Sequence, residues 1–370
     1  MTESKTLKGF LFLIASLFAL ALGLRYSELC AEGVRYGIEL SVSKLIPSLF
    51  PFLVISDIIV RSGACDALTR LLGGAFSAIF GMSRECALPF FLGMMLGFPI
   101  GIRSAISLYE SGRISRAELL RLSLFTSIPS PAFLISAVGE GLFGSWSFGL
   151  TLYFIAIFVS IVIGMLSRFF FSQYEGEYFC IRHSESRSFV GVGVFLDAVS
   201  SSAMSLLSIS AFVVFFSMLC EVLEHLLASV PFFDSPYIIT LFLGSLEMTG
   251  GAARAALLGV EGAPLAAAIL GFSGLSVLCQ FSFACREGGL SAKPYFLSKL
   301  FSSGAYFLLS LGAIRLFGDK MGFSEPYAPS FILYRENRLS LALFAFFICA
   351  CFVAVNDRKR KIFTKSLYKR

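Results

Sequence analysis

Three ionisable residues stand inside or beside long apolar runs of the sequence, where a charged side chain is unusual. Glu247 lies in the run LFLGSLEMTGG, and Arg103 and Arg254 each follow a glycine-containing interruption within two or three residues. An ionisable group inside an apolar helix is costly to bury and marks a functional site by default. A carboxylate there can bind a cation, carry a proton, or pair with one of the arginines. A purely structural ion pair between helices is the alternative interpretation.

The two interruptions occupy corresponding positions in two halves of the chain. Leu96–Arg103 (LGFPIGIR) aligns with Leu246–Ala253 (LEMTGGAA) at an offset of 150 residues, and Arg254 falls one position from the counterpart of Arg103. Broken backbone at membrane depth leaves N–H and C=O groups that lipid cannot satisfy, so such breaks persist where they line a cavity. Paired breaks in two halves are typical of a transporter. Kinked spans whose small residues allow close packing are the alternative.

A further pair of interruptions, Phe125–Pro129 and Phe272–Ser276, follows at a slightly smaller offset. Arg103, Arg254 and the positive N-termini of half-helices would attract an anion, and Glu247 would serve coupling or gating. The sequence therefore predicts a binding site for a small anionic solute, without metal ligands. The remaining residues expected at this site are Gly97, Pro99, Gly101, Thr126, Ser127, Pro129, Ser130, Thr249, Gly250 and Gly251.

Membrane helices must position these segments, because the composition leaves no other solvent for so much apolar surface. Apolar residues make up 56% of the 370 residues and charged residues 15%, against roughly 25% charged in soluble domains. We count about ten apolar segments, or about eight spans if some are half-helices. The clearest windows are Gly9–Leu24, Leu40–Val60, Ser145–Phe170, Val192–Leu227, Leu297–Phe317 and Leu339–Val355, and the interrupted ones are Ala87–Tyr109, Leu119–Val138, Tyr237–Val260 and Ala263–Ala284.

The predicted fold is an all-α polytopic membrane protein, with about 8–10 transmembrane or re-entrant helices in two pseudo-symmetric halves. The segment Ser172–Ser188 is the most polar part of the middle of the chain, and it is predicted to be a linker between the halves. The predicted organisation is an N-terminal span and connector (1–33), a first half (34–170), the linker (171–191), a second half (192–317), and a loop, last span and basic tail (318–370).

The distribution of charge and the absence of familiar signatures exclude several classes of function. Lysine and arginine are concentrated in the tail Arg358–Arg370, which predicts a cytoplasmic C-terminus. The net charge of +6 thus forms no basic face, and no nucleic-acid partner is expected. Glu221, Glu224 and His225 are interpreted as a solvated helix end rather than a metal site, and the nine cysteines as small buried apolar side chains. Without G-x-S-x-G, H-E-x-x-H or Walker A motifs, we expect no enzyme, catalytic residue or cofactor.

The order and spacing of the motifs resemble the YlbJ family of sporulation integral membrane proteins, from about residue 35 to 315. That family carries the nucleoside-recognition "Gate" domain shared with concentrative nucleoside transporters and the membrane part of ferrous-iron transporters. This chain departs from the family pattern at Ser127, where asparagine is common, and at Ile100, where a small polar residue is usual. The matching motifs are Leu49–Phe52, Leu96–Gly101, Gly112–Ile114, Leu122–Pro131, Val138–Gly139 and the acidic break Glu247–Gly251.

The resemblance implies a role in endospore formation, namely export of dipicolinic acid from the mother cell across the outer forespore membrane. The protein would then reside in the bacterial cell membrane or the outer forespore membrane. The expected partners are the lipid bilayer, a small anionic solute (dipicolinate) and a coupling cation or proton, and the sequence leaves oligomerisation open. A nucleoside-type transporter is one alternative. The other is a non-transporting assembly or receptor protein of the sporulating envelope, with Ser172–Ser188 and Gly318–Asn337 as its partner surfaces.

Overall fold

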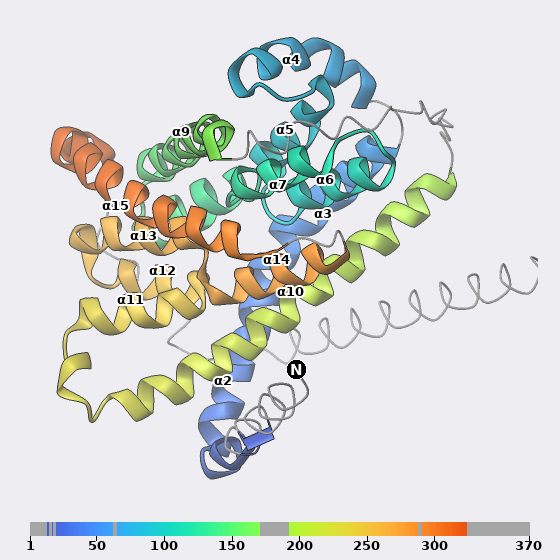
Figure 1. Ribbon diagram of the computed structural model, residues 1–370. Coiled ribbons are helices and arrows are strands. Elements are labelled where there is room, and N and C mark those ends of the chain that lie inside the picture. Colours follow the sequence, from blue (N-terminus) through green and yellow to red (C-terminus); the bar gives the residue numbers. More distant parts are fainter. Residues whose placement is uncertain are drawn as a thin grey trace, which may run out of the picture.

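The computed structural model describes residues 20–61, 65–170, 192–287 and 291–323, together with Leu13, Ile14 and Leu17. These residues form helices joined by turns and include no strand (Figure 1), so the predicted all-α class is confirmed. Some predicted segments lie outside the described residues: the linker 171–191, the span Leu339–Val355, the tail Arg358–Arg370 and half of the span Gly9–Leu24.

The first half begins with a nearly continuous helical stretch and continues as a series of shorter helices. Ser115 and Glu118 start one of them with a reciprocal cap: the Ser115 hydroxyl accepts from the Glu118 N–H at 3.2 Å, and the Glu118 carboxylate accepts from the Ser115 N–H at 2.9 Å. The elements are α2 (Ser27–Leu40), a π-helical turn (Ser41–Leu45), α3 (Ile46–Arg61), α4 (Cys65–Phe80), a 3-10 turn (Arg84–Cys86), α5 (Ala87–Leu96), α6 (Ile100–Glu110), α7 (Arg116–Phe125), a π-helical segment (Ala132–Glu140), α8 (Gly141–Phe143) and α9 (Trp146–Phe170).

The second half begins with the longest described helix, α10 (Val192–Leu227). The final described helix extends to Met321, beyond the end at Phe317 that the sequence predicts. After α10 come a 3-10 turn (Pro231–Phe233), α11 (Pro236–Leu246), α12 (Met248–Ala256), a 3-10 turn (Gly259–Gly262), α13 (Ala263–Phe272), α14 (Gly274–Glu287) and α15 (Lys293–Met321).

Within the described part of the chain, four helical segments are long and apolar enough to cross a membrane: α9, α10, α15 and Gly259–Phe283, which runs through the break between α13 and α14. A fifth span results if Thr69–Phe80 and Arg84–Leu96, which bend by 103° at their junction, count as one. Large apolar side chains project from these helices, including Phe154 and Phe158 on α9 and Leu316 on α15. Such exposure suits lipid as the surrounding solvent.

The helix order repeats between the two halves. The helix before the first break ends at Leu96 in the first half and at Leu246 in the second, 150 positions later. The long helix that closes each described half begins at Trp146 and at Lys293, 147 positions apart. All four apolar segments that the sequence shows as interrupted are indeed split into two helices, as α5–α6, α7 with the π-helical segment, α11–α12 and α13–α14.

Glycines let the two helices of a broken pair approach each other at the backbone. A Cβ atom on Gly251 of α12 would lie 2.2 Å from the Cα of Gly244 on α11. In the first half, a Cβ on Gly101 of α6 would lie 2.9 Å from the Cα of Gly93 on α5 and 2.5 Å from the Thr126 carbonyl oxygen. Small residues at such contacts are typical of helix packing in membranes, and here they recur in both halves.

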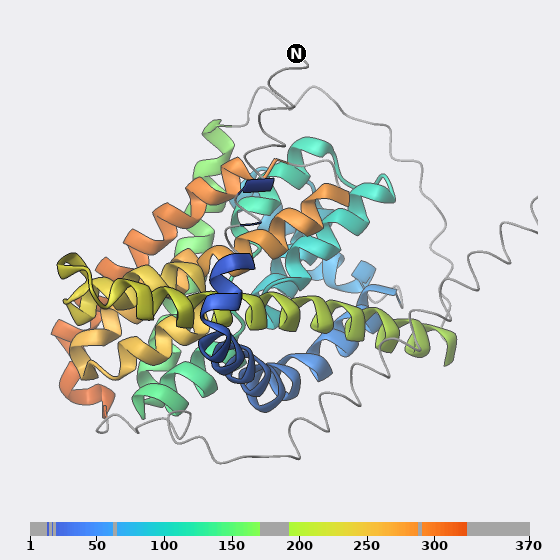
Figure 2. The ribbon, with the colours of Figure 1, turned by 90° about the horizontal axis from the view of Figure 1, so that it is seen from below.

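Helix α10 connects the two groups of broken helices. In Figure 1 it runs diagonally across the molecule, with α5–α7 toward one end and α11–α13 toward the other, and Figure 2 shows it along its length beside α2. It packs against α2 and α3 and also touches α11 and α14. Because α10 contacts both halves, the number of residues between two of its contacts gives the distance between the sites in the two halves.

The glycine contact of the second half predicts a large stability difference between two matched substitutions. Replacing Gly251 by alanine should lower the free energy of unfolding by about 1–3 kcal/mol, because the added methyl group overpacks the contact with Gly244. Replacing Gly304 in α15, where an added Cβ meets nothing within 4 Å, should be neutral or stabilising by up to about 1 kcal/mol. Thermal unfolding of the purified variants in detergent measures both, and equal stability would contradict the packing described.

Candidate functional site

In each half, two broken helices cross at their breaks. In the first crossing, the Phe98 N–H donates to the Ile128 carbonyl at 2.9 Å, and Gly97 adopts a φ of 77° with its backbone against Ser130. In the second crossing, a Cβ on Gly274 would lie 3.1 Å from the Met248 nitrogen, so the break after α13 lies on the break after α11. The predicted breaks therefore exist and meet in pairs.

Most of the predicted polar residues of the first crossing complete helix ends. The Thr126 hydroxyl donates to the Leu122 carbonyl at 2.8 Å, and the Ser130 hydroxyl accepts from the Phe133 N–H at 3.2 Å. Pro99 stands at the N-cap of α6, and Pro129 lies in the break after α7. Ser127 differs, because its hydroxyl is buried with no hydrogen-bond partner among the described residues.

Glu247, in the second crossing, is buried and caps the N-terminus of the helix that follows it. One carboxylate oxygen accepts from the Thr249 N–H at 2.9 Å and the other from the Gly250 N–H at 2.5 Å. Two of the first amides of α12 are therefore engaged by the protein's own carboxylate rather than presented to a solute. The helix N-terminus in turn supplies the positive potential that a buried carboxylate needs.

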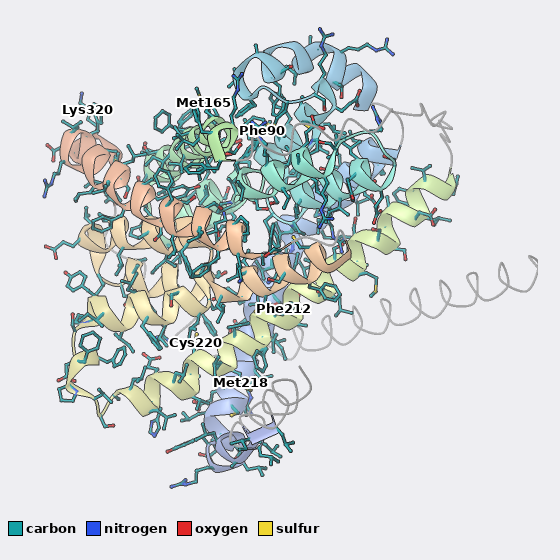
Figure 3. All side chains as sticks on the ribbon, in the orientation of Figure 1. Phe90, Met165, Phe212, Met218, Cys220 and Lys320 are labelled. Carbon is teal, nitrogen blue, oxygen red and sulfur yellow. The ribbon has the colours of Figure 1, made fainter. Side chains whose placement is uncertain are left out.

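A small cavity of about 20 Å³ lies beside Glu247. Its walls come from α2, α10, α11 and α12, and Figure 3 labels Cys220 on the α10 wall. This volume is room for about one water molecule, not for an aromatic dicarboxylate. A larger solute can enter only in another conformation. The lining residues are Tyr36, Ser217, Cys220, Glu221, Leu243, Glu247, Gly250, Gly251 and Arg254.

The two predicted arginines are not brought together. Arg254 pairs with Glu224 at 2.5 Å, and Arg103 donates to the Ser205 hydroxyl. Both partners lie on α10, nineteen positions apart, which at 1.5 Å per residue is about 28 Å. One small anion cannot contact both arginines at that separation, so the expectation of joint attraction needs correction. Glu224, predicted as part of a solvated helix end, is half-buried and holds Arg254.

Sequence reasoning missed a buried cation at the first crossing, Lys299 of α15. Its ammonium group donates to the Ser127 carbonyl at 2.5 Å and lies 5.3 Å from the centre of the Tyr295 ring. On the Tyr295 ring also stacks Phe281 of α14, with the ring centres 3.6 Å apart. Lysines near the polar end of an apolar run usually extend their ammonium group to the membrane–water interface, and on that basis Lys299 is not expected at a site. The signal was present, since Lys299 falls within the predicted span Leu297–Phe317.

Arg121 is a second buried cation that the sequence did not single out. Its guanidinium donates to the Phe80 carbonyl at 2.5 Å, the Gly81 carbonyl at 3.2 Å and the Ser167 hydroxyl at 3.1 Å. The two carbonyls end helix α4, so Arg121 satisfies groups that the helix itself cannot. Its contacts explain it as a structural residue.

The fold and the crossings define a class: an all-α integral membrane protein in which two repeats each carry a pair of broken helices that cross at their breaks. Residues 42–146, which include the first crossing, match the family model described as Gate, nucleoside recognition. The chain is 27% identical over 328 aligned residues to the sporulation integral membrane protein YlbJ of Bacillus subtilis (strain 168), covering 78% of this chain and 79% of that protein. The family resemblance inferred from the motifs is thus confirmed. No solved structure matches the chain significantly.

The ion pair between Arg254 and Glu224 should be weak enough to exchange partners. Both side chains are about one-third exposed, and pairs of this kind contribute roughly 0.2–1 kcal/mol. A double-mutant cycle of Arg254→Ala and Glu224→Ala, read by thermal unfolding in detergent, should give a coupling energy in that range. A coupling above about 2 kcal/mol would show instead that the pair is a fixed structural element.

Proposed function

We propose that the protein is a membrane transporter or facilitator of a small anionic metabolite, and that its solute is dipicolinate, exported from the mother cell during endospore formation. The observation that carries the proposal is the pair of crossings, each formed by two broken helices. Such backbone occurs at membrane depth where protein or a water-filled path surrounds it. The similarity to a protein named for sporulation supports the cellular setting.

The repeated architecture supports alternating access as the mechanism. In transporters built from repeats, the binding sites lie between the repeats, and one part rocks against the other around the site. Here the cavity beside Glu247 is too small for the proposed solute, which fits a closed conformation. Close backbone contacts such as Gly244–Gly251 keep each broken pair together as a unit while the pairs move relative to one another.

Glu247 is proposed as the coupling residue. Its carboxylate is buried at a crossing, holds the start of α12, and borders the cavity that Tyr36 and Arg254 also line. Binding of a proton or a cation there would weaken its hold on the two amides. The start of α12 would then be free to move, and Arg254, in its exchangeable pair with Glu224, would be available as a counter-charge.

A nucleoside-type transporter is the second candidate, because the family model that matches residues 42–146 is described by nucleoside recognition. The anionic solute is preferred because three cations, Arg103, Arg254 and Lys299, lie at or near the crossings. A non-transporting assembly protein would need no broken helices at its centre.

Purified protein reconstituted into vesicles should move labelled dipicolinate in a saturable manner. Glu247→Gln keeps the shape of the side chain but removes its charge, so it should reduce the flux at least about tenfold or abolish its dependence on an ion gradient. Glu261→Gln, which changes an exposed carboxylate of the same half, should leave the flux unchanged. Uridine supplied in place of dipicolinate tests the nucleoside alternative.

Three results would change the proposal. Unimpaired, gradient-dependent flux in Glu247→Gln would remove this carboxylate from the mechanism. Saturable flux of uridine with none of dipicolinate would establish the nucleoside alternative. Absence of saturable flux for either solute would leave the assembly role, and would overturn transport altogether.

A further inference from the structure

Lys299 stands at the first crossing as a buried amine, and among the described residues it has no counter-charge. It is 4% exposed, and no carboxylate among the residues that the structure describes pairs with it. An ammonium group has three N–H donors, whereas the contacts of Lys299 are one carbonyl, that of Ser127, and one aromatic face, that of Tyr295. A buried amine in this situation is strongly destabilising as a charge unless a counter-charge pairs with it or it gives up its proton.

Two hydroxyl groups next to Lys299 are also buried and poorly supplied with hydrogen-bond partners. The Ser127 and Tyr295 side chains are 3% and 1% exposed, and their oxygens have no partner at hydrogen-bond geometry in the described part of the chain. The two hydroxyls are neighbours, within reach of a loose hydrogen bond to each other that falls short of normal geometry. Buried polar groups are nearly always hydrogen-bonded. The Lys299 amine contacts the backbone of one of these residues and the ring of the other, so it and the two hydroxyls lie in one buried region.

A purely structural role accounts for the contacts of Arg121 but not for those of Lys299. Arg121 holds two carbonyls at the end of α4 and a serine hydroxyl, so its donors are used by the fold. Lys299 touches a single carbonyl of the break, although it is equally buried. A lysine that only completed a helix end would not need beside it two hydroxyls that bond no other residue in the described part of the chain.

We propose that Lys299, Ser127 and Tyr295 form the binding site for a carboxylate group of the transported solute. The ammonium group would pair with the carboxylate, and the two hydroxyls would donate to its oxygens. Phe281, stacked on Tyr295, holds that ring in place. This inference rests on the proposed transport function and deepens it by locating the anion at the first crossing, where α15 of the second half meets the break after α7 of the first half.

The proposal also gives the two crossings different tasks. The first crossing holds a buried cation, Lys299, and the second a buried anion, Glu247. A carboxylate solute suits the first, and a proton or cation suits the second. The repeat would then carry the solute and the coupling ion at equivalent points of its two halves.

The test is direct binding of dipicolinate to the full-length protein in lipid nanodiscs, measured by titration calorimetry. Lys299→Gln should weaken binding at least about tenfold, since hydrogen bonds to charged groups are among the strong ones. Ser127→Ala and Tyr295→Phe should each weaken it about threefold to tenfold. Two controls should bind as the wild type does: Lys320→Gln at the far end of α15 (Figure 3), and Ser310→Ala, whose buried hydroxyl bonds within its own helix.

The outcomes separate this inference from the transport function. Wild-type binding that Lys299→Gln leaves unchanged overturns the carboxylate site while transport stands. If Lys299→Gln does not fold, the two hydroxyl variants decide, and unchanged affinity in both overturns the site. If the wild type neither binds nor moves dipicolinate or pyridine-2-carboxylate, the anionic function itself fails. Binding of uridine that none of the three substitutions weakens would likewise show that the anionic function fails.

Discussion

The structure depends on how broken backbone is satisfied inside a membrane. Each break leaves N–H and C=O groups without helical partners, and hydrocarbon offers none. In the first half the partners come from the crossing break, as in the Phe98–Ile128 hydrogen bond. In the second half they come in part from a side chain, the Glu247 carboxylate on the start of α12. The breaks can exist only because they cross. The need to satisfy the backbone at the breaks therefore determines both how the short helices of each half pack and where the site lies.

The close crossings in turn require small residues and a long helix against which to pack. Glycines on α5, α6, α11 and α12 allow backbone contact within the first broken pair of each half. Helix α10 spans the distance between the halves and receives one arginine from each, at Ser205 and at Glu224. This arrangement keeps the two arginines well apart, which is why a single anion cannot be shared between them. Each half therefore needs its own means of stabilising a buried charge.

Much of the architecture follows from local properties of the sequence. Apolar runs, their interruptions by glycine and proline, and the 150-residue offset between the halves predict the helices and all four breaks, because backbone freedom and helix length are set by neighbouring residues. The structure confirms the all-α fold and shows helix ends at Leu96 and Leu246, where the aligned motifs begin. The position of Glu247 at a break was predictable for the same reason, and so was the resemblance to the YlbJ family.

The pairing of charges was decided only by the tertiary structure. Lys299 meets Ser127 across 172 positions, and Arg254 meets Glu224 across 30. Such contacts depend on which helix faces lie together, and apolar membrane helices carry little pattern that records it. Glu247 binds the amides of its own helix, although the sequence equally allowed a pair with either arginine. The sequence by itself thus determined where the chain breaks and where charge is rare, whereas packing decided which charges meet, because burial energies depend on neighbours that are distant along the chain.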